Sequence, residues 1–118
     1  MAENVVLVKS FSFAVKIVKL YKYLCESKKE YVLAKQLLKS GTSVGANVKE
    51  AVNAQSKKDF ISKMNIALKE ANECEYWIEL LLETNYLTES QGEEILQDCR
   101  ELNKILCSIV KTSKKVNC

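Results

Sequence analysis

Residues 36–82 decide the fold and read QLLKSGTSVGANVKEAVNAQSKKDFISKMNIALKEANECEYWIELLL. The stretch contains a helical segment interrupted by small residues, a turn with a capping signal, and a long helix. In that long helix apolar residues recur at alternating spacings of four and three: Phe60, Met64, Ala67, Ala71, Cys74, Ile78 and Leu81. Such a row is typical of a packing seam between helices. The stretch therefore predicts how helices pack far more clearly than it predicts any chemistry.

The small residues lie in a helix that we expect from Glu30 or Tyr31 to about Ala54. Gly41 and Gly45 are four residues apart, so they share one face of that helix. Each glycine in a helix interior costs about 1 kcal/mol relative to alanine. A compensating interaction is therefore expected, and the absent side chains predict the close approach of another helix. A kink or loop within residues 40–46 is the alternative.

Two further helices flank this region. The N-terminal one carries two apolar rows, which are Phe11, Ala14, Val18, Tyr21 and Cys25 on one side and Phe13, Ile17, Leu20 and Leu24 beside it. The C-terminal one carries a single row, made of Ile95, Cys99, Leu102, Leu106 and Ile109. Capping signals at Ser56–Asp59 and Thr88–Gln91 mark the starts of the third and fourth helices.

Four helices with short connections predict an all-α fold, an antiparallel up-down-up-down four-helix bundle that forms a single domain over residues 1–118. A monomeric bundle needs one apolar stripe per helix. The surplus apolar rows, which include Ile61, Leu68 and Leu82 beside the seam of the long helix, therefore predict contact with another subunit. We expect a ring of identical copies that meet through the helix with the small residues and through these surplus rows.

Charge is unevenly distributed although the net charge is only +3. Residues 1–50 contain nine lysines and four acidic residues, whereas residues 70–101 contain ten acidic residues and one arginine. Such segregation steers an anionic partner to the first half, or makes copies of the chain complementary to one another. Solvated helix faces of opposite sign are the third interpretation.

The residues that usually carry chemistry are scarce. The chain has no histidine and its five cysteines form no CxxC pair, so no usual zinc site or general base is predicted. Residues 39–45 lack the Gly-Lys-Ser/Thr ending of a phosphate loop. Glu50, Glu70 and Glu73 resemble the carboxylates of di-iron bundles, but those sites also use histidine, and a structural polar network is the preferred interpretation. We therefore predict no enzyme activity, no metal and no cofactor.

The cellular setting follows from the same composition. Cysteines at or beside apolar stripes are expected to be reduced core residues of a cytoplasmic protein, whereas Cys118 is expected to be exposed. Apolar runs are shorter than the roughly 20 residues needed to cross a bilayer, and the first residues do not have the pattern of a signal peptide. No membrane association is predicted.

Nucleic-acid binding is the main functional prediction from the residues alone. Lysines of the first helix and of its C-terminal end form the candidate basic face: Lys9, Lys16, Lys19, Lys22, Lys28 and Lys29. Neighbouring Tyr23 and Tyr31 could stack on bases. In a symmetric ring this weak basic face is repeated, so its contributions add through multivalency.

The central residues closely resemble a bacterial family, the 23S rRNA intervening-sequence proteins, also labelled S23 ribosomal protein. The matching segments are residues 36–40, 42–50, 67–71 and 76–77, together with Ser56, Asp59, Phe60 and Glu73. On this resemblance we assign structural roles to Ser40, Ser43, Gly45, Asn47, Glu50, Asp59, Phe60, Glu70, Glu73 and Trp77. The family implies a four-helix bundle assembled as a homopentamer, without catalytic activity.

The family is also similar to the accessory variability protein of diversity-generating retroelements, a basic pentamer that binds nucleic acid and a reverse transcriptase. The expected function is accordingly a non-enzymatic oligomeric scaffold or adaptor that binds RNA, DNA or a ribonucleoprotein through the repeated basic face. The alternative is a structural or protein-binding assembly with no nucleic-acid role.

Overall fold

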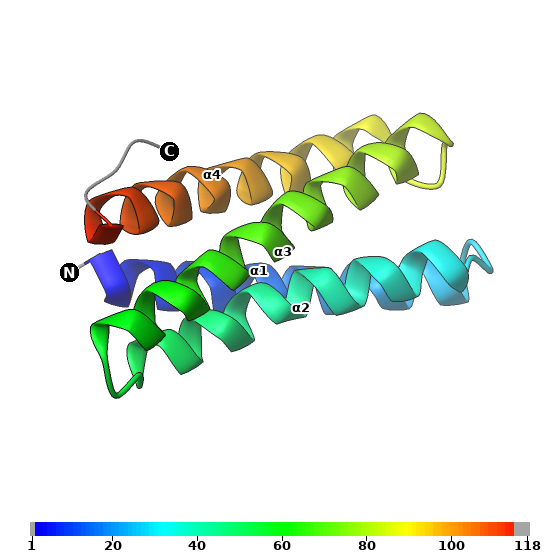
Figure 1. Ribbon diagram of the computed structural model, residues 1–118. Helices are drawn as coiled ribbons and strands as arrows, with labels where there is room; N and C mark the ends of the chain where they lie inside the picture. The colour runs from blue at the N-terminus through cyan, green and yellow to red at the C-terminus, as the bar shows by residue number, and fades with distance from the viewer. Residues whose placement is uncertain (1, 115–118) are drawn as a thin grey trace.

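The described residues form a bundle of four helices and contain no strand (Figure 1). The structure is a computed structural model that describes residues 2–114, with side chains from residue 5 onward; Cys118 lies outside the described residues. The helices are α1 (Ala2–Glu26), α2 (Val32–Val52), α3 (Lys57–Glu83) and α4 (Glu89–Lys114). The predicted all-α four-helix fold is confirmed, whereas the ring remains a prediction.

Helices that follow one another in the chain run antiparallel and pack side by side (Figure 1). The α2–α3 pair has the most extensive contact, and α4 closes the bundle against α1 through the loosest of the four helix pairs. Helices α1 and α3 lie diagonally opposite and run in the same direction. This arrangement leaves the outer sides of α1 and α3 on opposite faces of the molecule.

The predicted seam of α3 lies in the core. From Met64 to Leu81 all of its members have no exposed surface, and Phe60 at its start is half-buried. Of the two apolar rows on α1, the row that contains Phe13 and Ile17 lies in the core. The row that begins with Phe11 remains partly or largely exposed. Part of the surplus apolar surface predicted from the sequence is therefore located on α1, whereas the second row on α3, made of Ile61, Leu68 and Leu82, is half-buried.

Helix α2 is uninterrupted through residues 40–46, so the alternative of a kink or loop there is wrong. Its two glycines form the close crossing with α1. A Cβ atom at Gly41 would lie 2.7 Å from Cγ1 of Ile17, and one at Gly45 would lie 3.2 Å from the carbonyl oxygen of Ser10. The two helix backbones approach so closely only because these side chains are absent.

Capping side chains define the starts of α3 and α4. Ser56 accepts a hydrogen bond from the backbone N–H of Asp59 at 3.0 Å. At α4 the box is reciprocal, because Thr88 Oγ1 accepts from the N–H of Gln91 at 3.1 Å and Gln91 Oε1 accepts from the N–H of Thr88 at 3.0 Å. Both predicted helix starts are confirmed.

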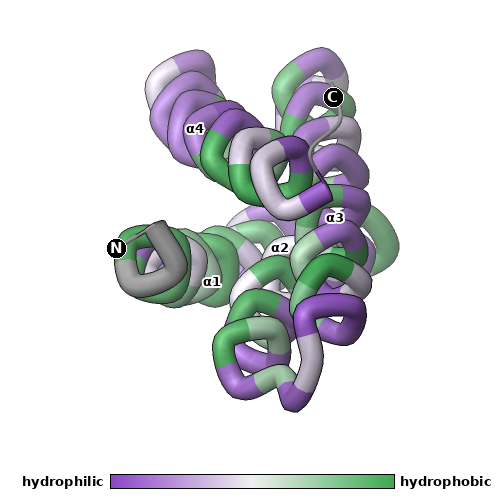
Figure 2. The backbone as a smooth tube through the Cα atoms, turned by 60° about the vertical axis from the view of Figure 1, so that its left-hand side comes forward, coloured by the Kyte–Doolittle hydropathy of each residue, from purple (hydrophilic) through white to green (hydrophobic). Residues whose placement is uncertain are grey.

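The helices differ in hydropathy. Figure 2 shows much of α1 as hydrophobic, whereas α4 is mainly hydrophilic. Even so, within residues 2–114 none of the helices combines the length and the apolar composition needed to span a membrane.

Candidate functional site

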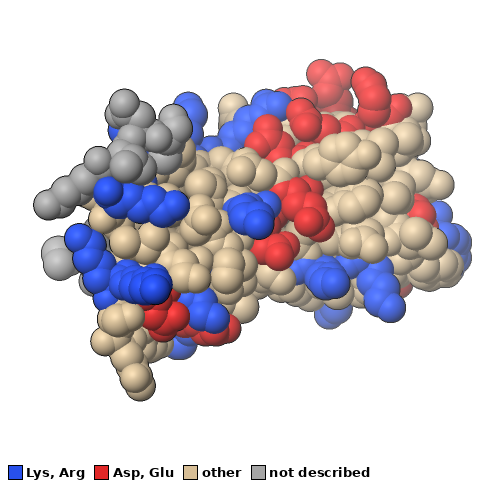
Figure 3. Space-filling model, in the orientation of Figure 1, with Lys and Arg blue, Asp and Glu red and all other residues tan. Residues whose placement is uncertain are grey.

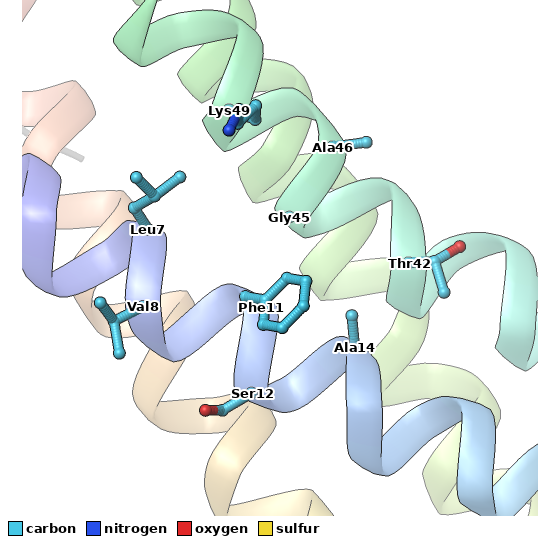
Figure 4. Close-up of a pocket in the computed structure, with 9 residues that line it drawn as sticks. All are labelled: Leu7, Val8, Phe11, Ser12, Ala14, Thr42, Gly45, Ala46 and Lys49. Carbon is cyan, nitrogen blue, oxygen red and sulfur yellow. The ribbon is translucent and has the colours of Figure 1, made fainter.

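A groove of about 620 Å³ runs between α1 and α2 on the surface of the bundle (Figure 4). Most of its lining is apolar or small: Leu7, Val8, Phe11, Ser12 and Ala14 from α1, and Thr42, Gly45, Ala46 and Lys49 from α2. The groove exists because Gly45 and Ala46 leave α2 nearly without side chains where α1 crosses it. It is a shaped apolar surface with Lys49 as the charged residue of its lining.

The outer apolar row of α1, which we define as Val5, Val8, Phe11 and Val15, borders this groove. The exposed fractions of these side chains are 46%, 66%, 71% and 39%. Single exposed apolar residues are ordinary, but a contiguous row beside an apolar groove marks an interaction site. This row and the groove form the candidate self-association surface.

Two of the six predicted basic residues are engaged within the chain. Lys9 Nζ lies 3.2 Å from Oε1 of Glu101, and Lys16 Nζ lies 2.7 Å from Oδ2 of Asp98 and 3.7 Å from Oε1 of Glu94. The hydrogen bond with Asp98 raises the pKa of Lys16. Both lysines therefore hold α1 to α4 across the loosest edge of the bundle, where solvent-exposed pairs contribute at most about 1 kcal/mol each.

The other four predicted basic residues, Lys19, Lys22, Lys28 and Lys29, are exposed. No ion pair to any of them occurs among the described residues. They continue along the outer side of α1 and into the turn to α2, where Lys29 has a positive φ of 54°. The structure thus divides the predicted basic face into lysines that brace the bundle and lysines that face solvent.

The structural residues on α2 cluster near the close crossing. Ser40 is fully buried, and its hydroxyl donates to the carbonyl oxygen of Gln36 at 3.0 Å. The hydroxyl of Ser43 donates to the carbonyl oxygen of Lys39, and the amide of Asn47 donates to that of Ser43 at 2.9 Å. Each of these polar groups forms its hydrogen bond with a backbone carbonyl of α2 itself. Small polar side chains can therefore lie at the close crossing without leaving a donor unpaired.

The structural residues near the α2–α3 turn are Glu50, Asp59 and Phe60. Glu50 Oε1 lies 3.0 Å from Lys63 Nζ and raises the pKa of that lysine through a hydrogen bond. Asp59 lies in the first turn of α3, where a negative charge suits the helix dipole. Phe60 packs against the core. Together they fix the turn that orients α3 against α2.

The structural residues in the middle of α3 form an aromatic and acidic surface. Trp77 Nε1 donates to Oε2 of Glu73 at 3.3 Å, and its ring meets that of Tyr76 edge-on with centroids 5.0 Å apart. Tyr76 is 57% exposed. Glu70 is half-buried beside Glu73, and burial, followed by the charge of Glu73, raises the pKa of its carboxyl.

The raised pKa of Glu70 makes a testable prediction about pH. The pKa of the Glu70 carboxyl is higher in the folded protein than the unfolded value of about 4.3. Ionisation of this group therefore lowers the free energy of unfolding as pH rises through the folded-state pKa. We expect Glu70→Gln to raise the midpoint of thermal unfolding at pH 7, by the equivalent of no more than about 0.5 kcal/mol. The gain should vanish below pH 4. Thermal scans from pH 3.5 to 7.5 test this, and a variant less stable than the wild type at pH 7 would contradict it.

Glu50, Glu70 and Glu73 do not form a common site. Glu50 pairs with Lys63 near the α2–α3 turn, and Glu73 accepts from Trp77 in the middle of α3. Over the part of the chain that the structure describes, no group of three or more histidine, cysteine, aspartate or glutamate residues is placed to hold a metal ion.

Sequence reasoning missed a polar cluster between α3 and α4. Arg100 bridges Glu75 at 3.1 Å and Glu79 at 3.2 Å, and Asn103 donates to Glu75 at 2.9 Å. The sequence does contain a signal for it, because Arg100 is the one cation among ten acidic residues in residues 70–101. The cluster fixes the register of α4 on α3.

Comparison with known proteins identifies the family of this chain. The family model described as 23S rRNA-intervening sequence protein matches residues 2–108. The chain is similar, at 59% identity and a TM-score of 0.92, to a crystal structure from Bacteroides thetaiotaomicron. That structure is of a protein of unknown function from the S23 ribosomal protein family, and the match covers 94% of this chain and 99% of that one. No curated protein matches the chain.

Proposed function

The chain belongs to the 23S rRNA-intervening sequence protein family, and on that premise we propose that it is a non-enzymatic scaffold that assembles into a ring of identical copies. The single observation that carries this proposal is the outer apolar row of α1, in which Phe11 is 71% exposed beside an apolar groove. Burial of that row against another copy removes apolar surface from water, which is the main driving force for association. The family resemblance favours five copies.

The experiment for assembly is a direct mass measurement. A chain of 13.4 kDa that forms a pentamer has a native mass about five times larger. Light scattering after size exclusion, over a concentration series, distinguishes this from a dimer or a monomer. A monomer at tens of micromolar would overturn the proposed assembly.

We further propose that the assembled ring binds RNA through Lys28 and Lys29, the exposed lysines of the turn between α1 and α2. These lysines are neighbours in the turn, and a ring repeats them at each copy, so weak phosphate contacts add. The cytoplasm is the proposed setting, since thiols such as Cys74 and Cys99 persist there in reduced form. The alternative, a protein-binding assembly without nucleic acid, is favoured by the ion pairs that already occupy Lys9 and Lys16.

The RNA proposal predicts different effects for the two lysine groups. We expect Lys28→Ala combined with Lys29→Ala to weaken binding and to lower the slope of log K against log salt by about one for each lysine–phosphate pair removed. We expect Lys9→Ala and Lys16→Ala to change that slope much less. Fluorescence anisotropy with structured RNA and duplex DNA across a salt series measures both. Absence of binding by the wild type at low salt would favour the protein-binding alternative.

A further inference from the structure

The outer side of α1 changes character along its length. Its first half is the outer apolar row, which ends at Val15. Its second half continues on the same side with Lys19 and Lys22, both exposed, and then with Glu26. The surface is therefore apolar first and mainly basic afterwards. A partner that buries it must offer an apolar region followed by acidic groups.

The outer side of α3 offers one exposed apolar side chain followed by acidic groups. Ile66 is 38% exposed in the first half of the helix. At helical spacing the row continues through Lys69, Glu73 and Tyr76 to Glu83, whose side chains are all exposed. Between residues 73 and 98 the chain contains eight acidic residues and no lysine or arginine. Figure 3 shows acidic side chains gathered over the part of α3 and α4 toward their connecting turn.

The remaining helices are poorer matches. Among the described residues, α4 has no exposed large hydrophobic side chain, and the exposed ones of α2, Val32 and Val52, lie at its two ends. A pairing of α1 with α1 of a second copy would bury the apolar halves but leave Lys19 and Lys22 without acidic partners. Charge complementarity thus selects α3.

The arrangement of the bundle suits a contact between these two surfaces. Helices α1 and α3 lie diagonally opposite, so their outer sides face away from each other (Figures 1 and 2). They run in the same direction and have similar lengths, 25 and 27 residues. Rotation of copies about an axis along the bundle brings α1 of one copy to α3 of the next at the same height. A contact between two different surfaces closes into a ring when the rotation from one copy to the next closes, whereas a contact between identical surfaces gives a dimer.

We propose that the outer side of α1 in one copy packs on the outer side of α3 in the next, with the apolar row against the region of Ile66 and with Lys19 and Lys22 against Glu73 and Glu83. This inference rests on the proposed self-association and specifies its interface. Its apolar half supplies the affinity, and its charged half selects a heterologous contact over an isologous one.

Charge exchange across the contact tests the interface. One variant carries Lys19→Glu and Lys22→Glu, a second carries Glu73→Lys and Glu83→Lys, and a third carries all four substitutions. We expect each of the first two to weaken assembly at least tenfold, because like charges then face one another. The third should recover assembly to within about threefold of the wild type. Sedimentation velocity at low salt measures the assembly, and circular dichroism checks that each variant is folded.

The matched control is Lys104→Glu with Lys111→Glu, two exposed lysines on α4 outside the contact, which should leave assembly unchanged. Failure of the four-fold variant to recover, or an unchanged assembly of Glu73→Lys with Glu83→Lys, would overturn this interface while the wild-type ring still stands. A wild type that is monomeric would overturn the proposed self-association and this interface together.

Discussion

Replacement of Phe11 by glutamate is expected to convert the assembled protein into folded monomers of 13.4 kDa. Phe11 is 71% exposed within one chain, so the substitution removes little from the core, and its effect on monomer stability should stay within about 0.5 kcal/mol. In the assembly the same position is an aromatic anchor. A charge placed there loses its hydration without gaining a partner, and substitutions at such anchors cost about 2 kcal/mol or more.

The measurement is native mass over a concentration series, with the expected dissociation constant at least thirtyfold weaker than that of the wild type. Phe11→Leu keeps apolar contact and should retain assembly. Val32→Glu changes a residue that is 73% exposed at the start of α2, outside the outer apolar row, and serves as the matched control. If Phe11→Glu retained the wild-type mass, the assembly surface would lie elsewhere.

Replacement of Gly45 by leucine is expected to damage both folding and assembly. A Cβ atom at this position would lie 3.2 Å from the carbonyl oxygen of Ser10, a backbone atom that moves only if α1 moves. The remaining side-chain atoms would occupy the groove between α1 and α2. Overpacking of this kind typically costs about 1–3 kcal/mol, partly offset by about 1 kcal/mol of better helix propensity. We expect a net loss of about 1 kcal/mol, and no more than about 2 kcal/mol, in the free energy of unfolding.

Urea unfolding of Gly45→Leu in the Phe11→Glu background separates the two effects at protein concentrations where that background is monomeric. Ala46→Leu is the matched control, since Ala46 also lines the groove but is exposed, so its larger side chain has room (Figure 4). A Gly45→Leu chain with wild-type unfolding and wild-type mass would show that the crossing tolerates a side chain.

Local signals in the sequence predicted most of the fold. Ser56 and the Thr88–Gln91 pair act over three residues, so their capping roles do not depend on distant parts of the chain. The α3 seam was equally clear because its spacing admits a single buried face. The close crossing at Gly41 and Gly45 was predicted from the cost of glycine in a helix, although the helix that crosses there, α1, was not identified.

Tertiary arrangement decided what the sequence left open. Phe11 and Phe13 lie in parallel apolar rows of similar composition, and only the positions of α2 and α4 determine that Phe13 is buried and Phe11 is exposed. The same holds for the basic face. Lys16 and Lys22 look equivalent in the sequence, yet Lys16 reaches Asp98 on a helix 82 residues later, and Lys22 does not. Single-sequence patterns contain no information on such distant pairings.

The loose α1–α4 edge has a kinetic consequence. Each extensive helix contact in the described bundle joins neighbours in the chain, and only this edge joins its two distant ends. Helical hairpins of this kind close short loops and form rapidly, whereas the final edge must close a loop of nearly the whole chain. We infer that the α1–α4 edge is completed last during folding and opens first during native fluctuations, with Lys9 and Lys16 as the contacts that reseal it.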